Sequence, residues 1–432
     1  MTDTAATARH APHRPYGGRV LRVLAAAALV ASAFVAGVLL PEDRTHAPTP
    51  PLFAHWLPHV GIGTPLAVLV ALSVVVWGPS LAGRLSWRAA LGAGYGTALA
   101  WTFSLALVDG WERGFAGRLT TEHEYLDEVP GVTDVGAMLR EFTSRILDYQ
   151  PDSWATHVSA HPPGAFLVFI GLDRIGLSGG AWASAFVVLV GALTAVAVPV
   201  AVRAYVSEEH ARAVLPFVAL FPGAVWIGVS ADGLFAAVAA CGIALLATRR
   251  ALAGGVVLGF SVFLSYGLVL MGVLALAVLL SGPRGRDWRG VGVAVLGASA
   301  VVAVFAALGF WWLDGYHLVV ERYYQGIATP RAYSYWVWAN LAAAVFACGF
   351  APFAARWRKL PETARGAVTL AAAAAVAILV ADVSGLSKAE VERIWLPFTV
   401  WLVVLVPDRR RLWLAAQAVT ALAVNHLLLG DW

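Results

Sequence analysis

The chain has 432 residues, of which 59% are hydrophobic and only 13% are charged, and its mean hydropathy is +0.73. A soluble domain carries about a quarter charged residues, so the composition excludes an ordinary soluble enzyme and predicts a membrane protein. The pI near 9.2 does not indicate nucleic-acid binding, because the arginines lie in short segments between apolar runs, as the positive-inside rule requires. The two cysteines, Cys241 and Cys348, lie inside apolar runs and predict neither a disulfide framework nor a metal site.

Apolar runs long enough to cross a bilayer, about 20 residues, recur from residue 19 to the C-terminus. They predict an all-α polytopic membrane protein with about 13 membrane-spanning helices. The expected spans are residues 20–40, 63–82, 89–109, 180–203, 211–228, 231–248, 251–266, 267–281, 291–312, 336–355, 366–383, 394–407 and 411–429. The pair at 251–281 is short for two crossings, so it is either two short spans or a broken, re-entrant hairpin that bends near Gly267.

The distribution of arginine and lysine predicts a cytoplasmic N-terminus in the plasma membrane, with residues 1–18 as a disordered tail. Residues 19–250 then form a first transmembrane module, which includes a large outer loop at 110–179. Residues 251–432 form a second module with outer loops at 313–335 and 384–395.

The outer loop at 110–179 is the longest polar stretch of the chain. It contains an acidic cluster around a tyrosine at residues 120–130 and the motif His-Pro-Pro-Gly at 161–164. Between them, residues 138–149 place Leu139, Phe142, Ile146 and Tyr149 at helical spacing, which predicts a helix lying in the membrane interface. Residues 164–175 predict a second interfacial helix. A loop of this size is not needed to cross a bilayer, so we expect it to carry the function.

The sequence Glu-His-Glu-Tyr-Leu at 122–126, followed by His-Pro-Pro-Gly at 161–164, resembles the GT-C superfamily of integral-membrane glycosyltransferases. The similarity is to the branch of protein mannosyltransferases, aminoarabinose transferases and actinobacterial arabinofuranosyl- and methylthioxylosyl-type transferases. It covers roughly residues 90–250 by the order of elements. Thr121 stands where the aspartate of the family's acidic motif aligns, and Gly164 replaces a leucine. The resemblance implies a GT-C-like fold.

The resemblance further implies transfer of a sugar, either a pentose or modified pentose or else mannose, from a polyprenyl-phosphate donor to a cell-envelope acceptor on the outer membrane face. Such a transfer needs a carboxylate to take the acceptor proton and cations to stabilise the departing phosphate. Glu124 and Glu122 are the candidate bases, with Glu124 favoured because it adjoins Tyr125, a candidate substrate-binding residue. His161 either positions the acceptor or begins the Pro-Pro helix. The sequence indicates no certain cofactor, and His123 with Glu122 and Glu124 is a candidate site for a divalent cation.

The third outer loop contains Lys388, Glu392 and Arg393 directly before an apolar run. Ionisable groups at the entrance of a span are costly unless they are paired or functional. We expect Lys388 and Glu392 to pair at helical i,i+4 spacing, and Lys388 and Arg393 to clamp the donor phosphate. The alternative is that these residues anchor the helix at the interface beside Trp395.

Three further residues are secondary candidates for substrate binding. Arg322 and Arg331 lie in the tyrosine-rich middle outer loop and are suited to phosphate contacts. Asp232 lies at the outer end of a span hairpin, near the expected donor, although it would also serve as a helix cap.

Two other functions remain open from the sequence. A flippase or other transporter of lipid-linked sugars would be expected to show inverted repeats and ionisable residues deep within its spans, and the sequence shows neither. A non-catalytic subunit of an envelope assembly complex would share the composition and topology. The lipid bilayer is an expected partner under all three hypotheses.

Overall fold

The computed structural model describes residues 17–282, 285–356 and 364–430. The fold is all-α, as predicted, apart from one short pair of strands. Five helical stretches are long and apolar enough to cross a membrane: Gly18–Leu39 in α1, α3 (Thr64–Arg84), Gly180–Tyr205 across α9 and α10, α16 (Trp288–Ala307) and α20 (Arg365–Val383). The structure therefore supports a membrane protein, while the thirteen crossings predicted from the sequence are not established.

The other expected spans are mostly helical but are shorter or less apolar than these five. They correspond to α4 (Trp87–Ala106), α11 (Glu208–Ala219) with α12 (Ala224–Ile227), α13 (Ala231–Ala247), α14 (Ala251–Val262), α15 (Met271–Leu280), α18 (Tyr333–Cys348) and α23 (Arg410–Leu427). The expected span at 394–407 consists instead of short pieces: α21 (Val391–Ile394), α22 (Leu396–Thr399) and a 3-10 turn at Leu402–Val404. The expected break in 251–281 is present as the 3-10 turn Tyr266–Leu270.

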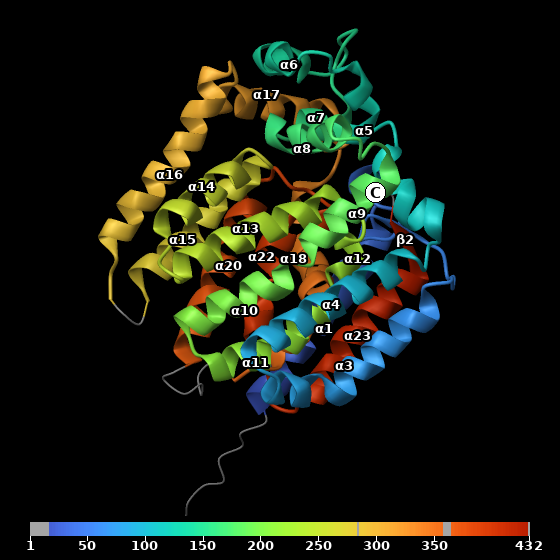
Figure 1. Ribbon diagram of the computed structural model, residues 1–432. Coiled ribbons are helices and arrows are strands. Elements are labelled where there is room, and N and C mark those ends of the chain that lie inside the picture. Colours follow the sequence, from blue (N-terminus) through green and yellow to red (C-terminus); the bar gives the residue numbers. More distant parts are fainter. Residues whose placement is uncertain (1–16, 283–284, 357–363, 431–432) are drawn as a thin grey trace, which may run out of the picture.

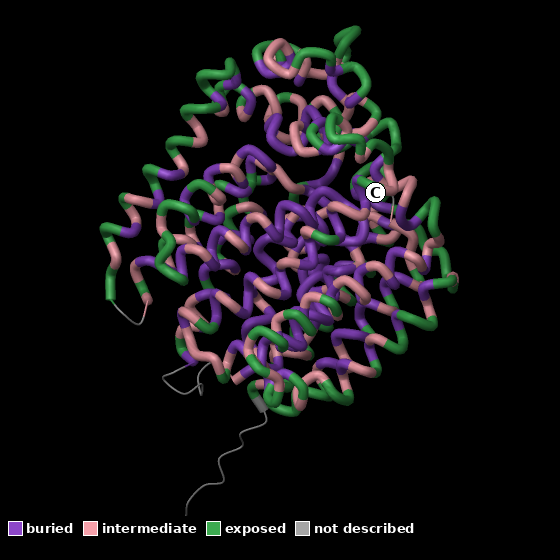
Figure 2. The backbone as a smooth tube through the Cα atoms, viewed as in Figure 1, coloured by how far each residue is buried: buried purple, intermediate pink, exposed green. Residues whose placement is uncertain are grey.

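The long helices form a broad bundle, and a smaller layer covers one end of it (Figure 1). Helix α13 runs through the middle of the bundle and nearly all of its residues are buried, whereas α3 and α16 lie at the periphery (Figures 1 and 2). Helices α1, α3 and α16 expose large apolar side chains. Apolar side chains on the outside of a helical bundle are what lipid contact requires. The covering layer contains α5 (Tyr125–Glu128), α6 (Val135–Glu141), α7 (Thr156–Ala160), α8 (Pro163–Arg174) and α17 (Trp312–Gln325).

The two helices predicted in the loop at 110–179 are partly correct. The second corresponds to α8, which is largely buried against the rest of the protein. The first is shorter than expected: Asp134 caps α6 by accepting a hydrogen bond from Ala137 N, and a 3-10 turn at Phe142–Arg145 follows. Tyr149 lies beyond this turn in a left-handed conformation (φ 65°) and is exposed. Its assignment to the apolar face was wrong, because the helix ends before it.

The segment that follows α1 also belongs to the covered end of the bundle, which the sequence did not indicate. Its strand β1 (Ala54–Trp56) pairs in antiparallel register with β2 (Leu428–Gly430), so that Ala54 faces Gly430. Arg118 donates a hydrogen bond to the carbonyl of Gly430 over 2.9 Å. The two strands, one near each end of the described chain, are thereby fixed to the segment at 110–179.

Helices α14 and α16 pack through glycines. Gly255 and Gly259 are four residues apart on α14, the spacing at which small residues let two helix backbones approach closely in a membrane. A Cβ added at Gly255 would lie 2.0 Å from the carbonyl oxygen of Ala294, and one added at Gly259 would lie 2.7 Å from the Cα of Ala298. Neither backbone atom can move away without separating the two helices.

We expect Gly255→Val to destabilise the protein by roughly 1–3 kcal/mol, the typical cost of overpacking. Gly292→Ala, on α16, is the matched control because a Cβ there meets no atom within 4 Å. Thermal stability of the purified protein in detergent, followed by retention of the folded peak in size-exclusion chromatography, measures the difference. Equal melting temperatures for the two variants would contradict the close contact.

Candidate functional site

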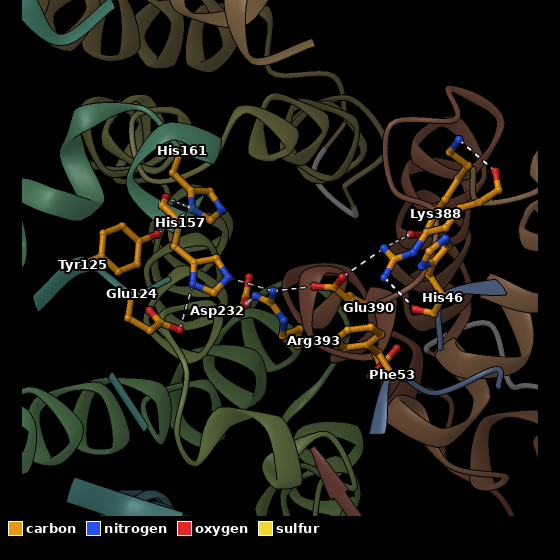
Figure 3. Close-up of polar contacts among 12 residues, drawn as sticks. His46, Phe53, Glu124, Tyr125, His157, His161, Asp232, Lys388, Glu390 and Arg393 are labelled. Carbon is orange, nitrogen blue, oxygen red and sulfur yellow. Dashed lines mark hydrogen bonds and ion pairs between the residues drawn. The ribbon is translucent and has the colours of Figure 1, made fainter. Parts of the chain in front are cut away.

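A chain of buried polar contacts runs across the covered end of the bundle (Figure 3). It starts at Glu124, which directly precedes α5, and passes to His157 of α7. It continues to Arg393 of α21, which also contacts Asp232 in the first turn of α13. These residues come from four elements far apart in sequence, so the fold itself brings them together.

Glu124 is the acidic residue of the segment at 110–179 that the fold buries. Its side chain is 5% exposed, and its Oε1 lies 2.9 Å from His157 Nδ1. Burial alone would raise the pKa of this carboxyl, but His157 and Arg393 outweigh it and lower the pKa below the ordinary value of 4.5. Glu124 is therefore ionised at neutral pH. Within the described residues its second oxygen, Oε2, is buried and accepts no hydrogen bond.

Arg393 is the cation at the centre of the contacts. Its guanidinium donates to Asp232 Oδ2 over 2.8 Å, to Glu390 Oε2 over 2.8 Å and to His157 Nε2 over 3.1 Å. Burial opposes the charge, but the two carboxylates outweigh this effect and raise the pKa of Arg393. A buried charge is tolerated only when it is paired in this way, so Arg393 and its partners must be considered as one unit.

Tyr125 and His161 form a second contact beside Glu124. The Tyr125 hydroxyl lies 2.6 Å from His161 Nδ1, and the Tyr125 ring stacks on Phe169 of α8 with centroids 5.0 Å apart. Burial is the main effect that lowers the pKa of His161 to about 4, although Asp232 opposes it. His161 is therefore neutral at physiological pH and is suited to hydrogen bonding rather than to charge stabilisation.

The contacts continue from Arg393 to a second cationic group. Glu390 Oε1 accepts from Arg331 over 3.1 Å, and Arg331 also donates to the carbonyl of Lys388 over 2.8 Å. The Lys388 ammonium donates to the carbonyl of Arg331 over 3.1 Å and lies 5.4 Å from the centre of the Tyr324 ring. Burial and the nearby Arg331 lower the pKa of Lys388. In the part of the chain that the structure describes, no carboxylate forms an ion pair with Lys388.

The loop that carries these cations has an unusual backbone. Ala389 and Glu390 are consecutive non-glycine residues in the left-handed region, with φ of 70° and 62°, a conformation that such residues seldom adopt. The buried Asn340 of α18 holds the loop: its amide nitrogen donates to the carbonyl of Ser387 over 2.8 Å, and its oxygen accepts from Ala389 N over 3.2 Å. This turn directs Lys388 and Arg393 to different parts of the site.

The structure brings most of the predicted residues together and separates three of them. Glu124, Tyr125, His161, Asp232 and Arg393 share one cluster, which Glu390 connects to Arg331 and Lys388. The three that lie elsewhere are Glu122, Arg322 and Glu392.

Glu122 has a side chain that is 85% exposed, 3.9 Å from His123 and outside the contacts around Glu124. Arg322 pairs with Asp148 over 2.7 Å. Glu392 is fully buried and accepts from Phe53 N over 3.0 Å. The expected pair of Lys388 with Glu392 does not form, because the left-handed turn between them destroys the helical spacing on which it depended.

Sequence reasoning missed His157 and Glu390, which connect Glu124 to the cations. His157 and His161 are four residues apart, a spacing that places two side chains on one face of a helix, and this was the available signal. It also missed the segment after α1, where Arg331 donates to the carbonyl of His46 over 3.2 Å and lies 5.2 Å from the centre of the Phe53 ring. No feature of that segment pointed to the site.

The described residues include no group of three or more His, Cys, Asp or Glu side chains arranged to hold a metal ion. The cluster of Glu122, His123 and Glu124 considered from the sequence is divided, since Glu122 is exposed while Glu124 is buried. Comparisons of the chain with protein-family models, with curated proteins and with solved structures find no match. The site must therefore be interpreted from its own geometry: an ionised carboxylate at Glu124, the neutral His161 and the paired Arg393 at one end of a membrane-type bundle.

Glu392 allows a test of the electrostatics of this region. Burial raises the pKa of Glu392 to about 7, although the Phe53 N–H opposes the shift. The folded protein holds the proton of Glu392 more tightly than the unfolded chain does. This preference stabilises the fold fully at pH values below the unfolded pKa, ordinarily 4.5, and the contribution is lost as the pH rises through the folded pKa of about 7. Glu392→Gln cannot ionise and keeps an oxygen for Phe53 N.

We expect Glu392→Gln to be more stable than the native protein at about pH 8, by on the order of 1–3 kcal/mol, and to lose this advantage towards about pH 5. Melting curves of the detergent-solubilised protein at both pH values measure the effect. Glu321→Gln, which removes an exposed carboxylate of α17, should change little at either pH. A stability gain that is the same at both pH values would show that ionisation of Glu392 is not its cause.

Proposed function

We propose that this protein is a membrane glycosyltransferase of the GT-C type, which moves a sugar from a polyprenyl-phosphate donor to a cell-envelope acceptor at the outer face of the plasma membrane. The observation that carries the proposal is the buried Glu124 carboxylate. It is ionised, and one of its oxygens has no hydrogen-bond partner among the described residues. His157 lies between this carboxylate and Arg393 and contacts both. A buried polar atom left unpaired requires an explanation, and a substrate hydroxyl supplies one.

The location of the site supports a lipid-linked substrate. The site lies where the covering layer meets the helix bundle, and peripheral helices of that bundle expose apolar side chains suited to lipid. A polyprenyl chain has to stay in the hydrocarbon while its sugar faces water, so an enzyme using such a donor needs its reacting groups at this boundary. The sugar in the proposal is a pentose or modified pentose, with mannose as the alternative, as the sequence resemblance implies.

In the proposed step, an acceptor hydroxyl attacks the anomeric carbon of the donor sugar. Its proton passes to Glu124 Oε2 as the new glycosidic bond forms. The bond between the anomeric carbon and the phosphate oxygen breaks, and its electron pair remains on the polyprenyl phosphate, which leaves. The proton on Glu124 then passes to solvent. Nothing is oxidised or reduced, and the carboxylate is restored for the next turnover.

The two cationic groups have different capacities for the phosphate. Arg393 is already paired with Asp232 and Glu390, whereas no described carboxylate pairs with Lys388. A phosphate at Lys388 would therefore gain a charge-assisted contact without displacing an existing one. Tyr324, beside the ammonium, is 46% exposed, so this end of the site lies near the surface. In the proposal, Lys388 holds the donor phosphate and Arg393 keeps the reacting end charged and ordered.

Glu124→Gln removes the proposed base with almost no change of shape. We expect it to lower kcat by about 10²–10⁴, the usual contribution of a general base, while the melting temperature stays close to the native value. The assay is transfer of radiolabelled sugar from purified polyprenyl-phosphate donors to a membrane acceptor fraction. Pentose and mannose donors are tested in parallel.

Glu122→Gln is the matched control, because it removes an exposed carboxylate two residues away and should retain activity near the native level. Full activity of Glu124→Gln, or equal loss in both variants, would refute the assignment of Glu124. If the native protein moves the lipid-linked sugar across liposomes without consuming an acceptor, it is a transporter and the transferase proposal is wrong.

Lys388→Gln tests the phosphate contact. A hydrogen bond to a charged group contributes about 1.5–3 kcal/mol, so we expect the KM for the lipid donor to rise by roughly tenfold or more. Lys388→Arg should recover part of the affinity. Arg113→Gln, which removes an exposed positive charge elsewhere on the outer loop, controls for general attraction of the anionic lipid. Unchanged donor KM in Lys388→Gln would exclude this residue from phosphate binding.

A further inference from the structure

The contacts of His157 determine which of its ring nitrogens carries the proton. Its Nε2 lies 3.1 Å from a guanidinium nitrogen of Arg393. A guanidinium has donors only and no acceptor, so the contact requires a lone pair on Nε2. In a neutral imidazole one nitrogen is the donor and the other the acceptor. The proton of His157 is therefore on Nδ1, which faces Glu124 Oε1 at 2.9 Å.

The backbone fixes both ends of this arrangement. His157 N donates to the carbonyl of His123, the residue directly before Glu124, over 2.9 Å, so α7 and the acidic segment are tied together. At the other end, Asp232 and Glu390 hold the guanidinium of Arg393 from two further directions. The His157 side chain is 14% exposed and lies between these two anchored groups. It has little freedom to turn its ring over without losing both contacts.

We infer that His157 is the positioning residue of Glu124: Arg393 selects the Nδ1–H tautomer of His157, and that N–H directs the carboxylate so that Oε2 faces the acceptor hydroxyl. The inference rests on the proposed function for the role of Glu124, but the tautomer itself does not. The structure places His157, which sequence reasoning missed, between the carboxylate and its counter-charge (Figure 3).

The arrangement separates the effects of three substitutions. In His157→Asn the amide N–H can take the place of Nδ1–H and keep the contact with Glu124. In His157→Gln the longer side chain can place an oxygen near the position of Nε2, which keeps the contact with Arg393 but not the one with Glu124. His157→Phe keeps the ring shape and neither contact. A positioning role through Glu124 therefore predicts that Asn preserves more activity than Gln or Phe.

We expect His157→Phe and His157→Gln to lower kcat by about 100-fold with little change in donor KM, and His157→Asn to lie within about tenfold of the native enzyme. His123→Asn is the control. The carbonyl of His123 accepts the hydrogen bond from His157 N, but its side chain is 65% exposed, so this variant should keep native kcat. If all three variants of His157 lose kcat equally, in proportion to their loss of thermal stability, then His157 has only a structural role and the inference is overturned.

A second measurement does not depend on activity. The native protein labelled with ¹⁵N at histidine, in detergent or nanodiscs, is compared with His157→Asn to identify the ring signals of His157. A protonated Nδ1 and an unprotonated Nε2 support the inference, and loss of this preference in Arg393→Gln shows that the guanidinium sets it. A protonated Nε2 in the native protein would overturn the inference. If the native enzyme transfers no sugar, the proposed function fails, and the ¹⁵N spectrum still decides the tautomer.

Discussion

The candidate site depends on the burial of one positive charge. Arg393 lies in a region of low dielectric, where an unpaired ion would cost several kcal/mol, and the fold provides carboxylates for it from α13 and from its own loop. Removing one partner of such a group typically costs about 3–5 kcal/mol, because the remaining charge is left uncompensated. The residues around Arg393 are therefore constrained together: Asp232 cannot change without affecting Glu390, and neither can change without affecting His157 and Glu124.

This constraint explains how a buried carboxylate of the segment at 110–179 can keep its charge. Glu124 is buried, and burial alone would favour its neutral form. His157 and Arg393 outweigh burial and lower the pKa of Glu124, so the carboxylate keeps its charge. Near it, His161 is neutral for the ordinary reason, namely burial. Glu124 is thus charged because its neighbours outweigh burial, whereas His161 is neutral because burial dominates.

Much of this arrangement could be predicted from the sequence, and the rest could not for physical reasons. The apolar runs predicted the helices, since length and composition alone make them suited to lipid. Glu124 was a candidate because it precedes Tyr125 in the longest polar stretch of the chain, and the structure shows that it is buried. Glu392 was misplaced because helical spacing was assumed across residues that adopt left-handed conformations. Nothing in a sequence window shows that Asn340, about fifty residues earlier in the chain, makes that turn possible. His157 was missed because its importance comes from Arg393, which lies 236 positions later.

The small sheet between β1 and β2 has a consequence for the charged cluster. Strand β1 directly follows Phe53, whose backbone N–H holds Glu392 in the loop that carries Arg393. Its pairing partner comprises residues 428–430. These residues directly follow α23, so the support of the loop that carries Arg393 comes from two segments far apart in the sequence. A change that weakens the small sheet would therefore loosen the charged cluster without altering any residue of the cluster itself.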